Sequence, residues 1–90
     1  MNTELKKTFF RDLKKITDPA LKEVIRQVIE SVKQAKTMPD IPNLQKMKGY
    51  KNDIFYRIRI GDYRIGVTIE SDLVTFVRCM LRKDIYRFFP

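Results

Sequence analysis

The stretch FYRIRIGDYRIGVTI, Phe55–Ile69, alternates apolar and polar side chains and carries the pair Gly61–Asp62 at its centre. A period of two is the spacing of a strand that buries one face. A two-residue loop with Gly first is typical of a type II′ hairpin turn. The sequence therefore predicts an antiparallel hairpin. Its register pairs three sets of residues across the turn: Ile60 with Tyr63, Arg59 with Arg64, and Ile58 with Ile65.

This register gathers three arginines, Arg57, Arg59 and Arg64, on one face of the hairpin, called here the arginine face. Like charges directly opposite each other destabilise a strand pair by a few tenths of a kcal/mol up to about 1 kcal/mol. Guanidinium groups match phosphate geometry and stay charged at physiological pH. We interpret the arginine face as a phosphate-binding site. The alternative is a solvated surface whose arginine stems pack on Phe55.

Two amphipathic helices are predicted ahead of the hairpin, over residues 3–16 and 18–35. Asp18 is expected to cap the second helix, with Pro19 at its first position. Each helix carries an apolar stripe with residues three or four apart. The stripes comprise Leu5, Phe9, Leu13, Ile16, Leu21, Val24, Ile25, Val28, Val32 and Ala35. The short break between the helices predicts an antiparallel helix hairpin.

The segment 37–50 interrupts this periodicity, because Pro39 and Pro42 exclude a regular helix. We interpret it as a connector whose Leu44 and Met47 pack against the core. Helices followed by a strand meander indicate a single α+β domain. The two N-terminal helices are expected on one face of a small antiparallel sheet.

A third strand is predicted at residues 73–81, before the segment RKDIYRFFP. Strict alternation from Phe76 would put Arg78 and Arg82 on the core face. We therefore expect either a bulge, or an end of the strand near Cys79–Leu81, to turn Arg82 outward.

The amino-acid composition restricts the functions that this chain can have. Nineteen Lys and Arg against eleven Asp and Glu leave a net charge of +8, which attracts polyanions such as nucleic acid. A solvated basic surface and an acidic protein partner are the alternatives. The chain has no His, which excludes Ser–His–Asp and Cys–His catalysis. No metal site or cofactor is expected, and the single Cys79 is interpreted as a small buried apolar residue.

Localisation follows from what the chain lacks. No apolar segment has the length of a membrane span, and the start MNTELKKTFF is unlike a signal peptide. We expect a cytoplasmic protein that does not associate with membranes.

Arginines suit phosphoryl transfer, which needs mainly positioning and neutralisation of charge. With RNA as substrate, its own 2′-hydroxyl can serve as the nucleophile. Proton transfer is then the remaining need, and Tyr86 is the candidate. The alternative role of Tyr86 is packing against the sheet.

Four segments in order, FFRDLKKI, LQKMKGY, YRIRIGDYRIGV and TFVRCMLRKDIYRFF, resemble the RelE/ParE superfamily of type II toxins over nearly the whole chain. The resemblance implies a microbial-RNase-like fold and a cognate antitoxin that wraps the toxin. In the RelE branch it implies cleavage of mRNA on the ribosome by attack of the 2′-hydroxyl. In the ParE branch it implies inhibition of DNA gyrase instead.

The resemblance to the RelE branch assigns roles residue by residue. Arg64 would contact the scissile phosphate, Arg82 would stabilise transition-state charge, and Tyr86 would act as a base or stacking group. The expected RNA and phosphate contacts are Arg57, Arg59, Lys46, Lys48 and Lys83. The partners implied are an antitoxin, the ribosome and mRNA, with DNA reached only through the antitoxin.

The chain departs from the family pattern at two places. Many relatives carry His immediately before the arginine that matches Arg82, where this chain has Leu81. The usual first strand is expected to be almost missing, which would leave a sheet edge open. These departures motivate one alternative to the ribosome-dependent endoribonuclease, a catalytically decayed module that binds antitoxin or RNA. A gyrase inhibitor of the ParE branch is the other alternative, because that branch has the same fold.

Overall fold

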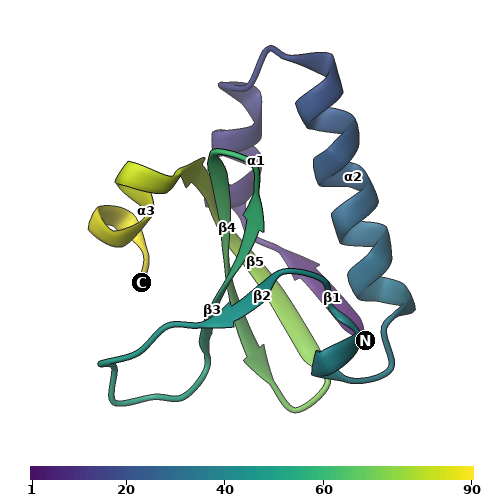
Figure 1. Cartoon of the computed structure of the whole chain (residues 1–90), viewed down its shortest axis with the longest axis vertical. Coiled ribbons are helices and arrows are strands. Elements are labelled where there is room, and N and C mark those ends of the chain that lie inside the picture. The colour runs from purple at the N-terminus through teal and green to yellow at the C-terminus, as the bar shows by residue number, and fades with distance from the viewer.

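The computed structural model of the protein describes all of residues 1–90 (Figure 1). In chain order the elements are β1 (Asn2–Leu5), α1 (Lys7–Lys14), α2 (Pro19–Gln34), a 3₁₀ turn (Met38–Asp40), β2 (Leu44–Lys46), β3 (Phe55–Ile60), β4 (Tyr63–Glu70), β5 (Leu73–Leu81) and α3 (Arg82–Phe88). None of the helices has both the length and the apolar character that crossing a membrane requires.

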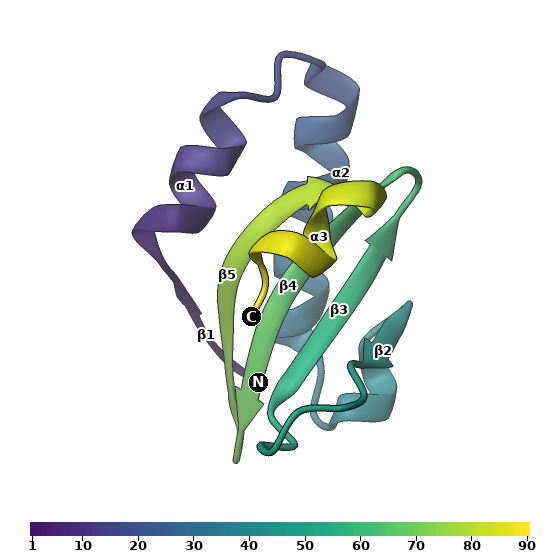
Figure 2. The same ribbon diagram turned by 90° about the vertical axis from the view of Figure 1, so that its left-hand side faces the viewer.

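The five strands form one sheet in the order β1-β5-β4-β3-β2. The helix hairpin of α1 and α2 covers one face of the sheet, and α3 lies on the other (Figures 1 and 2). The predicted α+β class and the two N-terminal helices on one face are confirmed. The sheet is mixed rather than wholly antiparallel, because β1 runs parallel to β5.

The β3–β4 hairpin has the predicted register. Ile60 pairs with Tyr63, Arg59 with Arg64, and Ile58 with Ile65. Gly61 has φ +54°, the left-handed conformation that the first position of a type II′ turn requires. The isoleucines face α1 and α2 and are buried in the main core. The other members of the main core are Phe9, Ile16, Ile25, Val32, Ala35, Ile41, Val67, Ile69, Val74, Phe76 and Cys79.

Strand β1 corrects the expectation of an almost missing first strand. The predicted helix over residues 3–16 begins only at Lys7, because the residues before it pair with β5 from Asn2↔Leu73 to Leu5↔Phe76. Met1, Thr3 and Leu5 are half-buried, while the residues between them are exposed. This period of two over five residues is the signature of a strand. The edge of β5 is therefore covered along β1.

Helix α2 begins and ends close to its predicted bounds. Pro19 is its first residue, and the Asp18 carboxylate accepts a hydrogen bond of 3.0 Å from the Ala20 N–H. The connector after α2 was expected to be irregular throughout. It instead contains the short strand β2, which pairs with β3. Leu44 packs on the main core, as predicted, whereas Met47 is buried with Ile85 and Phe89 instead.

Strand β5 contains the expected bulge, which lies at Val77. Gly66 of β4 pairs with Arg78, whereas Val67 pairs with Phe76, so Val77 has no partner. The extra residue reverses the alternation of β5, and Cys79 rather than Arg78 enters the main core. Strand β5 then ends at Leu81, within the range predicted for its end, and Arg82 begins α3.

Beyond β1 the edge of β5 is held by α1. The buried carboxylate of Asp12 accepts a hydrogen bond of 2.9 Å from the Cys79 N–H. The same carboxylate accepts bonds of 2.8 and 3.1 Å from the Arg78 guanidinium. This bond to Asp12 raises the pKa of Arg78, although burial opposes it. A single acid on α1 thus satisfies both the open backbone edge and a half-buried cation.

The C-terminal segment forms helix α3, which the sequence did not predict. It is fastened to the sheet by a small group of buried residues called the α3 cluster: Met47, Ile85 and Phe89. Gly66 allows this contact, because a Cβ built on it would lie 2.6 Å from the Phe89 ring. Only a glycine lets the aromatic ring rest directly on the backbone of β4.

Candidate functional site

Four arginines line one hollow of about 270 Å³ between β2, the β3–β4 hairpin and α3. Its lining, called here the arginine pocket, consists of Gln45, Arg57, Arg59, Arg64, Arg82 and Tyr86. No carboxylate is among these residues, so positive charge is concentrated without an anionic partner. Guanidinium groups in this arrangement offer several N–H donors to one tetrahedral oxyanion.

The β3–β4 hairpin supplies three of the arginines. Arg57 and Arg59 leave β3 on the face opposite the main core, and Arg64 leaves β4 directly across from Arg59. The Arg64 Nη1 donates hydrogen bonds of 2.8 Å to the carbonyls of Gly61 and Tyr63. These two bonds fix one edge of the Arg64 guanidinium and leave its other donors for a ligand.

Helix α3 supplies the fourth arginine of the pocket, Arg82, and its tyrosine, Tyr86. The Arg82 N–H donates a hydrogen bond of 2.8 Å to the carbonyl of Asp62, so α3 begins against the hairpin turn. Tyr86 follows one helical turn later, with 55% of its surface exposed. The Arg57 guanidinium carbon lies 5.1 Å from the centre of the Tyr86 ring, a cation–π contact that joins β3 to α3.

Arg64 is surrounded by like charges in the arginine pocket. Burial lowers the pKa of Arg64, and the positive charges of Arg82, Arg59 and Arg57 lower it further. Tyr86 acts in the opposite direction. None of the four arginines takes part in the ion pairs of the protein. A bound phosphate would therefore relieve repulsion between like charges as well as form new hydrogen bonds.

The structure brings together five of the predicted site residues. Arg57, Arg59, Arg64, Arg82 and Tyr86 all line the arginine pocket. The three predicted lysines do not. Lys46 pairs with Asp53 at 3.2 Å, and Lys48 and Lys83 are exposed outside the lining. Their assignment as RNA contacts stays a prediction.

Gln45 is the one residue of the pocket that the sequence did not indicate. It is brought there by β2, where Gln45 pairs with Arg57. A signal existed in the polar Gln45 beside half-buried Leu44, but three residues are too few for a reliable period.

Two residues lie apart from the arginine pocket. Leu81 lines a different hollow together with Tyr63 and Cys79, so the position at which relatives carry His does not face the arginines. Cys79 is buried, as predicted, and burial raises the pKa of its thiol to about 12, with the Asp12 charge adding to the effect. Such a thiol stays protonated at neutral pH and is a poor nucleophile.

Other proteins share this fold. A chain of the RelB–RelE antitoxin–toxin complex from Methanococcus jannaschii has a TM-score of 0.78 and 36% identity, over 97% of this chain and 99% of that chain. A chain of the archaeal RelE–RelB complex from Pyrococcus horikoshii OT3 shares the fold, with a TM-score of 0.70 and 17% identity over 90% and 93% of the two chains. The class these structures define is that of toxins in toxin–antitoxin pairs.

Sequence comparison leads to the same class. Toxin RelE3 of Methanocaldococcus jannaschii is 40% identical over 85 residues, which are 93% of each chain. The family model for the ParE toxin of the type II toxin–antitoxin system parDE matches residues 3–86. The chain belongs to the RelE/ParE superfamily of type II toxins and is RelE-like, which confirms the predicted resemblance.

Proposed function

We propose that this toxin is a RelE-type endoribonuclease that cleaves mRNA on the ribosome and is inhibited by a cognate antitoxin. The arginine pocket carries this proposal. Four guanidinium groups without a carboxylate partner line one hollow beside a tyrosine, in a chain 40% identical to a RelE toxin. A phosphodiester supplies the negative charge that such a pocket lacks.

The reaction proposed is an in-line displacement at phosphorus. The 2′-oxygen of the mRNA attacks the adjacent phosphate, the bond to the 5′-oxygen of the next nucleotide breaks, and a 2′,3′-cyclic phosphate remains. Arg64, held by its two carbonyl contacts, would bind the non-bridging oxygens. Arg82 would neutralise the charge that develops on them. Guanidinium groups supply this stabilisation without a metal ion or cofactor.

Proton transfer is assigned to Tyr86. The proton of the 2′-hydroxyl must leave as the P–O bond forms, and the departing 5′-oxygen must gain one. Tyr86 is the one lining side chain with a hydroxyl group, and Arg57 lies over its ring. The alternative role is stacking on a base, which a phenylalanine would also perform. Tyr86→Phe therefore separates the two roles.

The remaining predicted contacts lie around the pocket. Arg57 and Arg59 would bind phosphates of the same mRNA strand. Lys46, Lys48 and Lys83, outside the lining, would reach ribosomal RNA. A polyanionic partner of this size suits the net charge of +8.

The antitoxin is proposed as an acidic chain that docks on the helix hairpin. A largely apolar groove of about 440 Å³ separates α1 from α2, with Lys14, Lys22 and Arg26 at its border. Phe10 in this groove is 50% exposed. An amphipathic acidic helix would cover the apolar lining and pair with the basic border. Any DNA bound by the complex would be contacted through the antitoxin.

Primer extension of mRNA in a reconstituted translation system tests the proposal. New 5′ ends are expected only when ribosomes and toxin are both present. Arg64→Ala should reduce their rate of formation by about 10² to 10³, the loss typical of one oxyanion donor. It should also restore growth on expression while antitoxin binding is retained. Full cleavage or full toxicity in Arg64→Ala would refute the assigned role of Arg64.

A gyrase inhibitor is the second candidate, and the match of residues 3–86 to the ParE toxin model is the observation that favours it. Supercoiling by gyrase, with and without the toxin, distinguishes the two functions. Inhibition of supercoiling without mRNA cleavage would replace the nuclease proposal.

The third possibility is a catalytically decayed module that binds antitoxin or RNA, which Leu81 in the usual His position motivates. Its distinguishing result is normal growth on strong expression of the toxin without antitoxin.

A further inference from the structure

An exposed tyrosine lies beside the arginine pocket on the loop between β2 and β3. Tyr50 is 38% exposed, and its ring meets Phe55 edge-on with centroids 5.6 Å apart. Phe55 in turn meets Phe89 edge-on at 5.8 Å. Tyr50 is thus attached through two rings to the same cluster that fastens α3 to the sheet.

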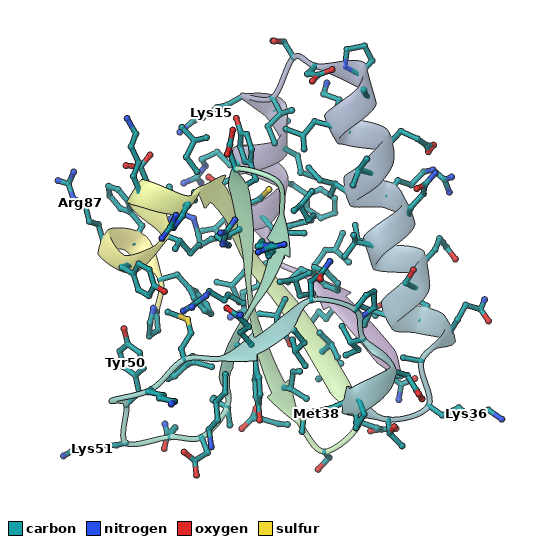
Figure 3. All side chains as sticks on the ribbon, viewed as in Figure 1. Lys15, Lys36, Met38, Tyr50, Lys51 and Arg87 are labelled. Carbon is teal, nitrogen blue, oxygen red and sulfur yellow. The ribbon has the colours of Figure 1, made fainter.

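The contact of Tyr50 with Phe55 of β3 relates Tyr50 to the pocket. Phe55 and Arg57 leave β3 on the same face, two residues or about 7 Å apart. Arg57 contacts Tyr86 of the pocket, while Phe55 contacts Tyr50. Tyr50 also lies on the side of the molecule that carries α3 (Figure 3). A nucleic acid strand that runs from the pocket along β3 toward Phe55 would therefore approach the Tyr50 ring.

The surroundings of Tyr50 suit a nucleic acid strand. Lys48 and Lys51 on the same loop are exposed cations. The nearby carboxylate of Asp53 is paired with Lys46. A tyrosine ring that is held by Phe55 and still partly exposed to solvent can serve as a stacking platform, which single-stranded RNA binders use without base specificity.

Phe88 provides a contrast within the same region. It is even more exposed, at 48%. Its ring already carries the guanidinium groups of Arg78 at 5.7 Å and Arg87 at 5.5 Å. These cations occupy the surface that a base would need. Exposure alone therefore does not define a stacking site, and Phe88→Ala serves as the matched control.

We propose that Tyr50 is a base-stacking residue of this toxin, which binds the nucleotide that flanks the phosphate held in the arginine pocket. The proposal rests on the proposed RNA substrate and adds a second contact to it. Tyr50 does not touch the reacting atoms; it holds the strand in place and so governs binding rather than the chemical step.

The test uses ribosomes programmed with an mRNA that carries 2-aminopurine beside the cleavage position and a 2′-deoxynucleotide that blocks cleavage. The protein contains no Trp, so it adds no indole fluorescence. Wild type and Tyr50→Phe should quench the probe on one side of the phosphate. Tyr50→Ala should abolish this quenching and raise the half-saturating toxin concentration about 5- to 150-fold, the cost of losing one stacked base. Phe88→Ala should behave as wild type.

The natural mRNA is cleaved in parallel, which separates the two proposals. At saturating toxin, Tyr50→Ala should cleave at the wild-type rate. Wild-type affinity and quenching in Tyr50→Ala, with cleavage intact, would overturn the stacking role alone. Tyr50-dependent quenching without cleavage by wild type would overturn the nuclease and leave the binding site. Absence of both in wild type would overturn both. Thermal unfolding of Tyr50→Ala and Tyr50→Phe verifies that each variant is folded.

Discussion

The two faces of the central sheet carry different kinds of side chain. On the face covered by α1 and α2, aliphatic and aromatic side chains from both helices and from β3, β4 and β5 are packed into the main core. On the other face a three-residue cluster holds α3 in place, and four arginines are gathered beside it without a carboxylate partner. The first face gains free energy from buried apolar area, and part of that gain offsets the like-charge repulsion on the second. Stability and the site can therefore be altered separately.

The largest expected effect is a loss of stability on substitution of a residue in the main core. Phe9 on α1 is fully buried, and its ring lies 5.4 Å from that of Phe76. Phe9→Ala should lower the free energy of unfolding by about 3 to 5 kcal/mol, measured by urea denaturation. Phe10→Ala is the control on the same helix. Because Phe10 is half-exposed, it should cost about 1 kcal/mol. Equal losses in the two variants would contradict the assignment of the core face.

An intermediate effect is expected where α3 rests on the sheet. In Gly66→Ala the new Cβ would lie 2.6 Å from the Phe89 ring, which must move. The displacement should cost about 1 to 3 kcal/mol of unfolding free energy, as overpacking typically does. Cleavage should fall as well, because α3 carries Arg82 and Tyr86. The added cost of Gly66→Ala should disappear in a Phe89→Ala background, which lacks the ring atoms that meet the new Cβ. A Gly66→Ala protein with unchanged stability and cleavage would show that the contact does not position α3.

The smallest effect has the opposite sign. Arg59 lies directly across from Arg64, so Arg59→Thr removes a like-charge pair from the arginine face. The variant should be more stable than wild type by a few tenths of a kcal/mol up to about 1 kcal/mol, and mRNA binding should weaken. The gain should shrink at high salt, where exposed charges are screened. A loss of stability at low salt would mean that Arg59 contributes more by packing than it costs by repulsion.

The part of the fold that sequence could predict is the part set by neighbours in the chain. The β3–β4 register follows from alternation and the Gly61–Asp62 turn, and it alone brings Arg59 opposite Arg64. The cap of α2 at Asp18 is likewise local. The three arginines of the hairpin were therefore predictable from the order of residues along the chain, whereas Arg82 was assigned through the family resemblance.

The features that sequence missed depend on distant partners. Strand β1 pairs with residues about 70 positions away, and Leu5 fits a helical stripe as well as a strand. Strand β2 is only three residues long, so Gln45 gave too weak a pattern. The need for a bulge in β5 could be deduced from the alternation of residues, but its position at Val77 depends on the pairing with β4.

The hairpin turns have a further consequence for where this chain tolerates insertion. Exposed turns usually accept extra residues. Here the Asp62 carbonyl holds the first N–H of α3, and the Asp72 carbonyl accepts the Asn2 N–H at 2.9 Å from β1. The turn at Asp62 thus holds the start of α3, and the turn at Asp72 holds the start of β1. Lengthening the first would detach the helix that carries Tyr86, and lengthening the second would release the N-terminal strand.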